Sequence, residues 1–267
     1  VSSNSVRAIM QDKYGFLWIG TEEGLNRYYG IMIKSYSICP QAAGKYISSL
    51  YGTKKNIWIG TDEGIYIYAY ATETFTYFDL TTPNNVRITS IVNHILQDKD
   101  GNLWFSTNGQ GLFRYNLSKN YLEQYEFTSA FGIVASTMAD SDTQIWALTN
   151  QGESGVYKLN KAENKFEPFG LLYNAGNHHS QALAMLEDSE QTLWLGTWEC
   201  GLQKIDKYTR QTTTYLHPTD GKGVTHIHSL MEYAPHQLLL GSDDRQILFS
   251  TLTEEDKQYT ENETVPV

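Results

Sequence analysis

The chain has 267 residues, of which 30 are acidic and 20 are basic, so its formal net charge is −10. This negative charge disfavours nucleic acid and anionic membrane surfaces as partners. No apolar stretch reaches the ~18 residues of a membrane-spanning helix. The two cysteines, Cys39 and Cys200, lie far apart in the sequence, and we assign them no role.

Short apolar runs separated by turn residues fill the beginning of the chain. The turns are Asp12 to Gly15 and Glu22 to Gly24, and the runs cover residues 6–10, 16–21, 25–29 and 31–36. Strands of five or six residues between Gly, Asp and Asn turns are typical of antiparallel sheet. No window of the chain shows the periodicity of an amphipathic helix. We therefore expect an all-β protein whose first segment is a four-stranded antiparallel sheet.

One phrase, of the type Gly/Asn-x-Leu-Trp-Ile-Gly-Thr, returns six times along the chain. Its anchors are 40 to 48 residues apart and are Trp18, Trp58, Trp104, Trp146, Trp194 and Leu239. A period near 45 with one β-rich unit per repeat predicts a β-propeller, whereas a solenoid of strands would have shorter repeats. We expect a single propeller domain over residues 1–267, with blade repeats at approximately 1–38, 39–80, 81–127, 128–169, 170–216 and 217–262.

The second strand of each repeat is apolar on both sides, as in Leu17-Trp18-Ile19. A strand that is covered on both faces reads as a continuous hydrophobic run. The middle strands of a propeller blade lie between two neighbouring blades and should have this character. We expect the glycines that follow, at positions 20, 60, 196 and 241, to make room for an aromatic ring of a neighbour.

Acidic residues open the turn after the first strand of several repeats, namely Asp12, Asp98 and Asp188. A sialidase-type Asp box places Asp five residues before Trp, but Asp98 is six residues before Trp104, so the match fails. A glycosidase would need two carboxylates that converge on the substrate. Asp is a common turn residue, and we interpret these residues as turn formers, with no catalytic residue identified.

Histidines gather in the last third of the chain, at positions 178, 179, 217, 226 and 228. Because strand directions alternate, the connections before the first strand and after the second strand emerge on one face. His178, His179, His217 and His226 are therefore expected on the face that carries Trp198. Metal binding requires tight spacing with Cys or carboxylate partners, which the pattern does not show. We expect solvated loop histidines, no metal and no cofactor.

Trp198 occupies a turn position where the first four repeats carry Glu22, Asp62, Asn108 and Asn150. An indole in place of a polar turn residue exposes apolar surface on a loop, which often marks binding, unless the ring folds back onto the neighbouring blade. The residues 151–155 and 171–181 add length to loops on the same face. The candidate ligand-binding residues are Trp198, Glu199, His178, His179, Asn177, Asn150 and Arg87.

The phrase from Asp98 to Trp104, continuing through Thr107 to Gly111-Leu-Phe-Arg-Tyr115, resembles the repeat of two-component regulator propellers. Residues 12–29 and 188–202 resemble it as well. The resemblance covers essentially the whole chain. It implies the N-terminal periplasmic sensor region of a hybrid two-component sensor histidine kinase/response regulator, from bacteria that forage on complex glycans.

A typical member of that family has two seven-bladed propellers, a β-sandwich, a transmembrane helix, and cytoplasmic kinase and receiver modules with a DNA-binding domain. The resemblance implies an oligosaccharide ligand. It also implies contacts with the second propeller and the β-sandwich of the parent chain, a homodimer of the parent, and anchoring in the inner membrane. This piece itself is expected to bind no nucleic acid.

The sequence departs from the family pattern in the number and quality of its repeats. Six repeats are present, so either the propeller closes with six blades or a seventh begins after Val267. Repeats two, four and six are degenerate: repeat two lacks the turn Asp, and repeat six has Leu239 in place of Trp. The chain starts at Val1 without an initiator Met, and we expect it to be a piece of a longer protein.

The sequence thus predicts a non-catalytic propeller that senses a ligand, by resemblance an oligosaccharide. Because propellers host many functions, two alternatives stay open. One is a polysaccharide-degrading lyase or glycosidase. The other is a protein-docking propeller without a sugar site.

Overall fold

The computed structural model describes residues 1–38, 45–125, 127, 135–140, 144–149, 155–171, 181–216, 226–243, 246–250 and 259–261. These residues form β-strands and the turns between them, and no α-helix occurs among them. Accordingly, this part of the chain contains no helix of the length and apolar character needed to cross a membrane. The chain divides into two compact units, residues 1–128 with 132–135 and residues 129–131 with 136–267.

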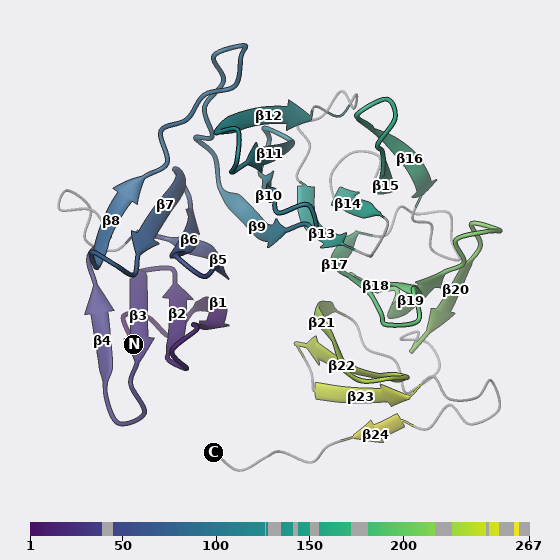
Figure 1. Cartoon of the computed structure of the whole chain (residues 1–267). Helices are drawn as coiled ribbons and strands as arrows, with labels where there is room; N and C mark the ends of the chain where they lie inside the picture. The colour runs from purple at the N-terminus through teal and green to yellow at the C-terminus, as the bar shows by residue number, and fades with distance from the viewer. Residues whose placement is uncertain are drawn as a thin grey trace. The chain divides into compact units, whose positions relative to one another are not determined.

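The first compact unit contains three four-stranded antiparallel sheets, each with its strands in chain order. In Figure 1, the β5–β8 sheet lies between the other two. The strands are β1 (Val6–Gln11), β2 (Leu17–Thr21), β3 (Gly24–Tyr28), β4 (Ile33–Tyr36), β5 (Ile47–Gly52), β6 (Asn56–Thr61), β7 (Gly64–Ala69), β8 (Thr74–Tyr77), β9 (Val92–Gln97), β10 (Leu103–Thr107), β11 (Leu112–Asn116) and β12 (Tyr121–Tyr125).

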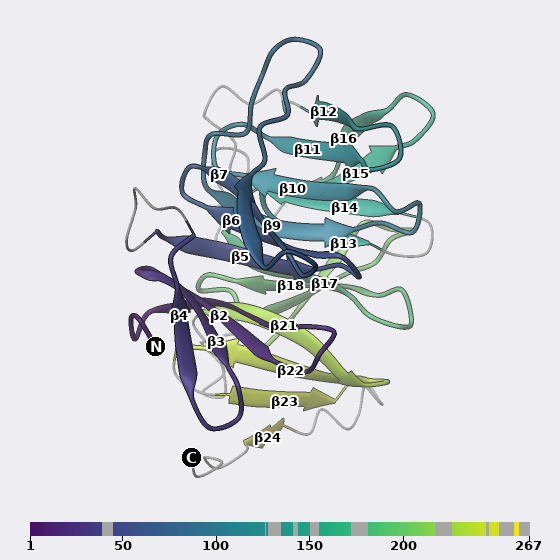
Figure 2. The ribbon, with the colours of Figure 1, turned by 60° about the vertical axis from the view of Figure 1, so that its left-hand side comes forward.

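The second compact unit repeats this plan with three further sheets. Figure 2 shows the strands of its last sheet following one another in chain order. The strands are β13 (Ala135–Asp140), β14 (Ile145–Thr149), β15 (Gly155–Asn160), β16 (Lys165–Leu171), β17 (Ala182–Glu187), β18 (Leu193–Thr197), β19 (Leu202–Ile205), β20 (Thr212–Tyr215), β21 (Ile227–Ala234), β22 (Gln237–Ser242), β23 (Gln246–Ser250) and β24 (Tyr259–Glu261).

The described strands therefore form six four-stranded antiparallel sheets, which are the blades of a β-propeller. This confirms the all-β propeller that the repeats predict. The four strands of the first blade fall where the apolar runs of the sequence place them.

The second strand is covered on both faces in the third, fourth and fifth blades, as predicted, whereas Leu17 and Ile19 of β2 are only half-buried. All five residues of β10, β14 and β18 are buried, whereas three of the four residues of the outer strands β4 and β20 are exposed. The apolar cores lie between consecutive blades. One joins Trp18 to Ile47 and Tyr68, and the next joins Trp58 to Phe105 and Phe113. In the second compact unit, equivalent cores form around Trp146 and Trp194.

The glycine after the second strand's apolar core lies against the first strand of the following blade. A Cβ added to Gly60 would lie 2.8 Å from the carbonyl oxygen of Val92, and one added to Gly196 would lie 2.6 Å from that of Ile227. At Gly20 the neighbour is the side chain of Ile47. The expectation that an aromatic ring fills these spaces is wrong. The glycines admit aliphatic side chains and backbone carbonyls of the next blade instead.

A β-bulge on the first strand brings these carbonyls close. The register of first and second strands shifts between Val6 and Ala8, between Ile47 and Ser49, and at the same place in three other described sheets. A bulge bends the strand and re-aims its backbone groups. The carbonyl of Val92 also accepts hydrogen bonds of 2.7 Å from the hydroxyls of Ser48 and Ser49, which fixes it against the preceding blade.

The histidine of β9 has a strongly shifted acid–base equilibrium. Burial lowers the pKa of His94 from 6.5 to about 4, because a charged imidazolium would lose its hydration there. His94 is half-buried and is paired with Ser106 in the register of β9, the first strand of its sheet, and β10. The folded state therefore holds this side chain neutral over the physiological pH range.

We predict that Gly60→Ala destabilises the chain by about 1–3 kcal/mol, because the added methyl group overlaps backbone that cannot move without shifting a strand. Thermal or urea unfolding measures the change. Gly52→Ala is the matched control, since its Cβ would meet the flexible end of Met10 and, at 3.9 Å, the hydroxyl of Tyr70, but no backbone atom of another strand. Equal stability loss in both variants would contradict the close-approach explanation.

We predict that stability falls on acidification because of His94. Between pH 6.5 and 4 the unfolded chain binds a proton at this position and the folded chain does not. The free energy of unfolding is therefore highest above pH 6.5 and declines as the pH falls below it. The loss should be about 1 kcal/mol between pH 7 and pH 5.5. Urea unfolding at several pH values checks this. His94→Gln should flatten the dependence by that amount, and an unchanged slope would refute the assignment.

Candidate functional site

The turn aspartates hold the anchor tryptophans of three blades. The indole Nε1 donates to a carboxylate oxygen in each case, over 2.8 Å from Trp18 to Asp12, 2.7 Å from Trp104 to Asp98 and 2.7 Å from Trp194 to Asp188. The other carboxylate oxygen accepts backbone N–H groups of the turn. One carboxylate thus closes the turn and pairs a buried indole six residues later.

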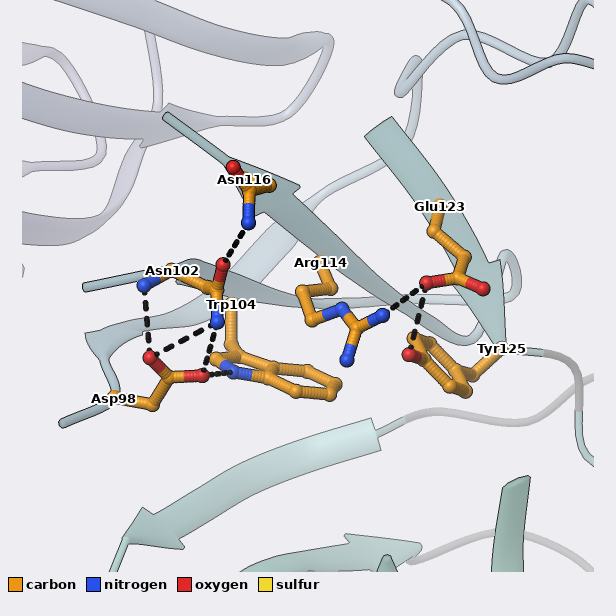
Figure 3. Close-up of polar contacts among 7 residues, drawn as sticks. All are labelled: Asp98, Asn102, Trp104, Arg114, Asn116, Glu123 and Tyr125. Atoms are coloured by element: carbon orange, nitrogen blue, oxygen red, sulfur yellow. Dashed lines mark hydrogen bonds and ion pairs between the residues drawn. The ribbon is translucent and has the colours of Figure 1, made fainter. Parts of the chain in front are cut away.

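Figure 3 shows the full polar network in the third blade. The guanidinium of Arg114 lies 5.6 Å from the ring centroid of Trp104 and pairs with Glu123 at 2.6 Å. Asn102 donates to Asp98 and accepts from Asn116. A cation over an indole face is stabilising where water is scarce.

Most anchor tryptophans are opposite a cation on the third strand. The cross-strand partners are Arg27 for Trp18, Arg114 for Trp104, Lys158 for Trp146 and Lys204 for Trp194. The second blade is the exception among these blades: Trp58 is opposite Ile67, and its indole N–H has no hydrogen-bond partner among the described residues. The turn of the second blade has Gly52 where the first, third and fifth blades have Asp, so the indole of Trp58 lacks the carboxylate that the other indoles bond.

These contacts confirm that Asp12, Asp98 and Asp188 are turn residues. Both oxygens of each carboxylate accept hydrogen bonds within its own blade. Sequence reasoning missed the bond to the indole, although the constant spacing of six residues between Asp and Trp was its signal.

Trp198 lies in the turn after β18. The backbone N–H of Trp198 donates to the carbonyl of Gln181 over 2.7 Å, and Thr197 donates to the carbonyl of Gly201, also over 2.7 Å. Glu199 adopts a left-handed conformation with φ of 66° and is exposed. The hydrogen bonds to Gln181 and Gly201 therefore hold the backbone of the turn. The side chains of Trp198 and Glu199 are both exposed.

The indole of Trp198 stacks on His226, with ring centroids 3.7 Å apart, and 41% of the residue remains exposed. Trp198 and His226 also form an isolated antiparallel bridge between neighbouring blades. The ring therefore packs against the next blade and still presents part of its surface to solvent. The expectation that His226 shares a face with Trp198 agrees with this contact.

Two histidines and a carboxylate meet beside this ring. The oxygens of Asp243 lie 2.8 Å from Nδ1 of His226 and 2.9 Å from Nε2 of His228. The hydrogen bond from His226 lowers the pKa of Asp243, so its carboxylate is ionised at neutral pH. The three ligand-type atoms all lie within 4.8 Å of one another. Sequence reasoning missed this cluster, because Asp243 is 17 residues from His226 and reaches it only through the β21–β22 hairpin.

Arg87 lies in the first compact unit, away from the turn of Trp198 in sequence. Its guanidinium pairs with Asp79 at 2.7 Å, and its carbonyl accepts from the side chain of Gln110. The remaining candidates, Asn150, Asn177, His178 and His179, lie outside the described residues, as does His217. Of the candidate set, the structure places Trp198 and Glu199 in one turn, and adds His226, His228 and Asp243 beside it.

Two segments of the chain are similar to the repeat of a known family. Residues 1–23 and 86–109 match the family model described as two component regulator propeller. Among characterised relatives, the histidine kinase P4 of Formosa agariphila is 28% identical over 151 residues, which are 54% of this chain and 11% of the kinase. The two matched segments contain the phrases Asp12 to Trp18 and Asp98 to Trp104.

Two solved structures show the same fold. The extracellular domain of a putative hybrid two-component system from B. thetaiotaomicron superposes with a TM-score of 0.77 at 21% identity, over 99% of this chain and 36% of that one. A catalytically inactive virginiamycin B lyase from Staphylococcus aureus, solved with quinupristin, gives a TM-score of 0.73 at 15% identity, over 96% and 83%. The chain thus spans about a tenth of the kinase and about a third of the extracellular domain.

We predict that Asp98→Ala destabilises the chain by about 1–3 kcal/mol, because it removes the carboxylate that accepts from the indole N–H of Trp104 and from the backbone of the turn. A double-mutant cycle with Trp104→Phe separates the two effects. In the Trp104→Phe background the cost of Asp98→Ala should shrink by at least about 0.5 kcal/mol. Strict additivity in urea unfolding would show that the indole bond contributes nothing.

Proposed function

We propose that this chain is the ligand-sensing propeller of a periplasmic two-component sensor and that it recognises an oligosaccharide at the turn of Trp198. The family repeats and the matching histidine kinase support the sensor class. The solved extracellular domain supports the fold of such a sensor. The observation that supports the sugar site is the exposure of Trp198, which is 41% exposed. The first four repeats carry a polar residue at the equivalent turn position.

The turn has the chemistry that a sugar requires. An aromatic face stacks on the C–H face of a pyranose ring, and an indole gives a large contact area at low cost in side-chain entropy. The bridge to His226 and the bond to Gln181 hold the turn before a ligand arrives, which reduces the ordering cost of binding. The exposed carboxylate of Glu199, next to Trp198, is an acceptor for hydroxyl groups.

Signalling in this proposal is a shift between two arrangements of the parent receptor. An oligosaccharide changes the equilibrium only if it binds one arrangement more tightly than the other. The second propeller, the β-sandwich and a second copy of the parent would provide the surfaces that differ between the arrangements. The kinase and receiver modules would then act in the cytoplasm, across the inner membrane.

An enzymatic function is the alternative that one observation favours, namely the fold that the chain shares with virginiamycin B lyase. A shared fold carries no activity by itself. The carboxylates of Asp12, Asp98 and Asp188 are bonded to indoles of their own blades and are poor candidates for acid–base chemistry. We therefore propose that this chain is non-catalytic.

We predict that Trp198→Ala weakens oligosaccharide binding at least about tenfold, because it removes the stacking surface. A calorimetric screen of defined oligosaccharides identifies a binding sugar first, and the variant is then titrated with it. Tyr208→Ala is the matched control, since Tyr208 is 97% exposed in the same compact unit and outside the turn.

An unchanged affinity in Trp198→Ala would refute the site, and equal losses in both variants would refute its specificity. Conversion of any of these glycans by the purified chain would favour the enzymatic alternative. If no glycan binds and the chain instead associates with the second propeller through Trp198, the docking alternative holds.

A further inference from the structure

We propose that His226, His228 and Asp243 form a binding site for a divalent transition-metal ion, with zinc as the best fit. The site is distinct from the sugar surface in its chemistry, and the proposal holds whether or not a sugar binds. It rests on the arrangement of three side chains on one hairpin of the sixth blade.

The hairpin geometry brings the three groups together. Ile227 is paired with Ser242 across β21 and β22, so His226 and Asp243 flank this pair at the same end of the hairpin. The bulge between Ile227 and Ser229 lies at His228. Consequently the imidazoles of His226 and His228 both reach the carboxylate of Asp243, and each contacts a different oxygen.

The distances suit a small tetrahedral ion. With zinc–ligand bonds of about 2.0–2.2 Å, ligand atoms in a tetrahedral site lie roughly 3.4 Å apart. The atoms here lie 2.8 and 2.9 Å apart in the two hydrogen-bonded pairs, and all three lie within 4.8 Å. His228 and Asp243 are exposed, so small side-chain rotations can open the two pairs to this spacing.

The donor set selects the class of ion. Two imidazole nitrogens and one carboxylate are the ligands of open zinc sites, in which water or a ligand oxygen takes the fourth position. Calcium and magnesium prefer all-oxygen surroundings.

Trp198 fixes one side of the site. Its ring stacks on His226 at 3.7 Å and is edge-on to His228 at 6.4 Å. A neighbour that holds the orientation of a ligating ring raises metal affinity. The indole thus limits the rotation of His226 and leaves its Nδ1 directed at Asp243.

The test is calorimetric titration of the metal-free 267-residue chain with zinc chloride at neutral pH. We expect one zinc ion per chain, an affinity at least about tenfold lower in His228→Gln and in Asp243→Asn, and no binding of calcium. Zinc should also raise the unfolding temperature of the unmodified chain and have a smaller effect on both variants, because it binds only the folded state.

His236→Asn is the matched control. His236 also faces a carboxylate, with Nδ1 3.1 Å from Glu190, but without the second histidine of this cluster. Its substitution should leave zinc affinity unchanged. Circular dichroism without zinc verifies that each variant folds. Asp243→Asn is a near-isosteric change at an exposed position, so its zinc affinity still tests the site if His228→Gln fails to fold. Zinc affinity that is absent in the unmodified chain, or equal in all variants, would overturn the proposal.

Discussion

The burial of second strands on both faces, complete in β10, β14 and β18, is the constraint on which the rest of the structure depends. A strand such as β18, with every residue buried, has no face left for water and requires a neighbouring sheet on each side. The glycines at positions 20, 60 and 196 let the next blade approach closely enough to provide that cover. The bulges on β9 and β21 then direct backbone carbonyls into the space that Gly60 and Gly196 leave.

The packing of the blades also fixes the conformation of the turns. Asp98 closes a turn because its carboxylate is held by the buried indole of Trp104, and the same pair recurs in the first and fifth blades. Trp198 is presented by a turn whose backbone is bonded to Gln181, just before β17 of the same blade, and bridged to His226 of the next blade. Variation at one turn position can therefore change what the surface binds without changing the blade beneath it.

The blades could be predicted from the sequence because their signals are local. The apolar run around Trp104 and its turn residues specify a strand and its limits, and their recurrence specifies the propeller. The filling of the space at Gly60 could not be predicted, since it depends on a bulge in another blade. The cluster at Asp243 was missed for a similar reason: it forms only when hairpin register brings distant residues together, and no fixed spacing marks it. Trp198, by contrast, was found because it breaks a pattern that its neighbours keep.

The central claim is that neighbouring blades stabilise the second strands by covering both of their faces. Native-state hydrogen exchange, read strand by strand, tests it most directly. The account predicts that the amides of β6, β10 and β18 exchange only through the largest opening events, while those of the outer strands β4, β8 and β20 exchange orders of magnitude faster. Outer strands protected as strongly as the second strands would contradict it.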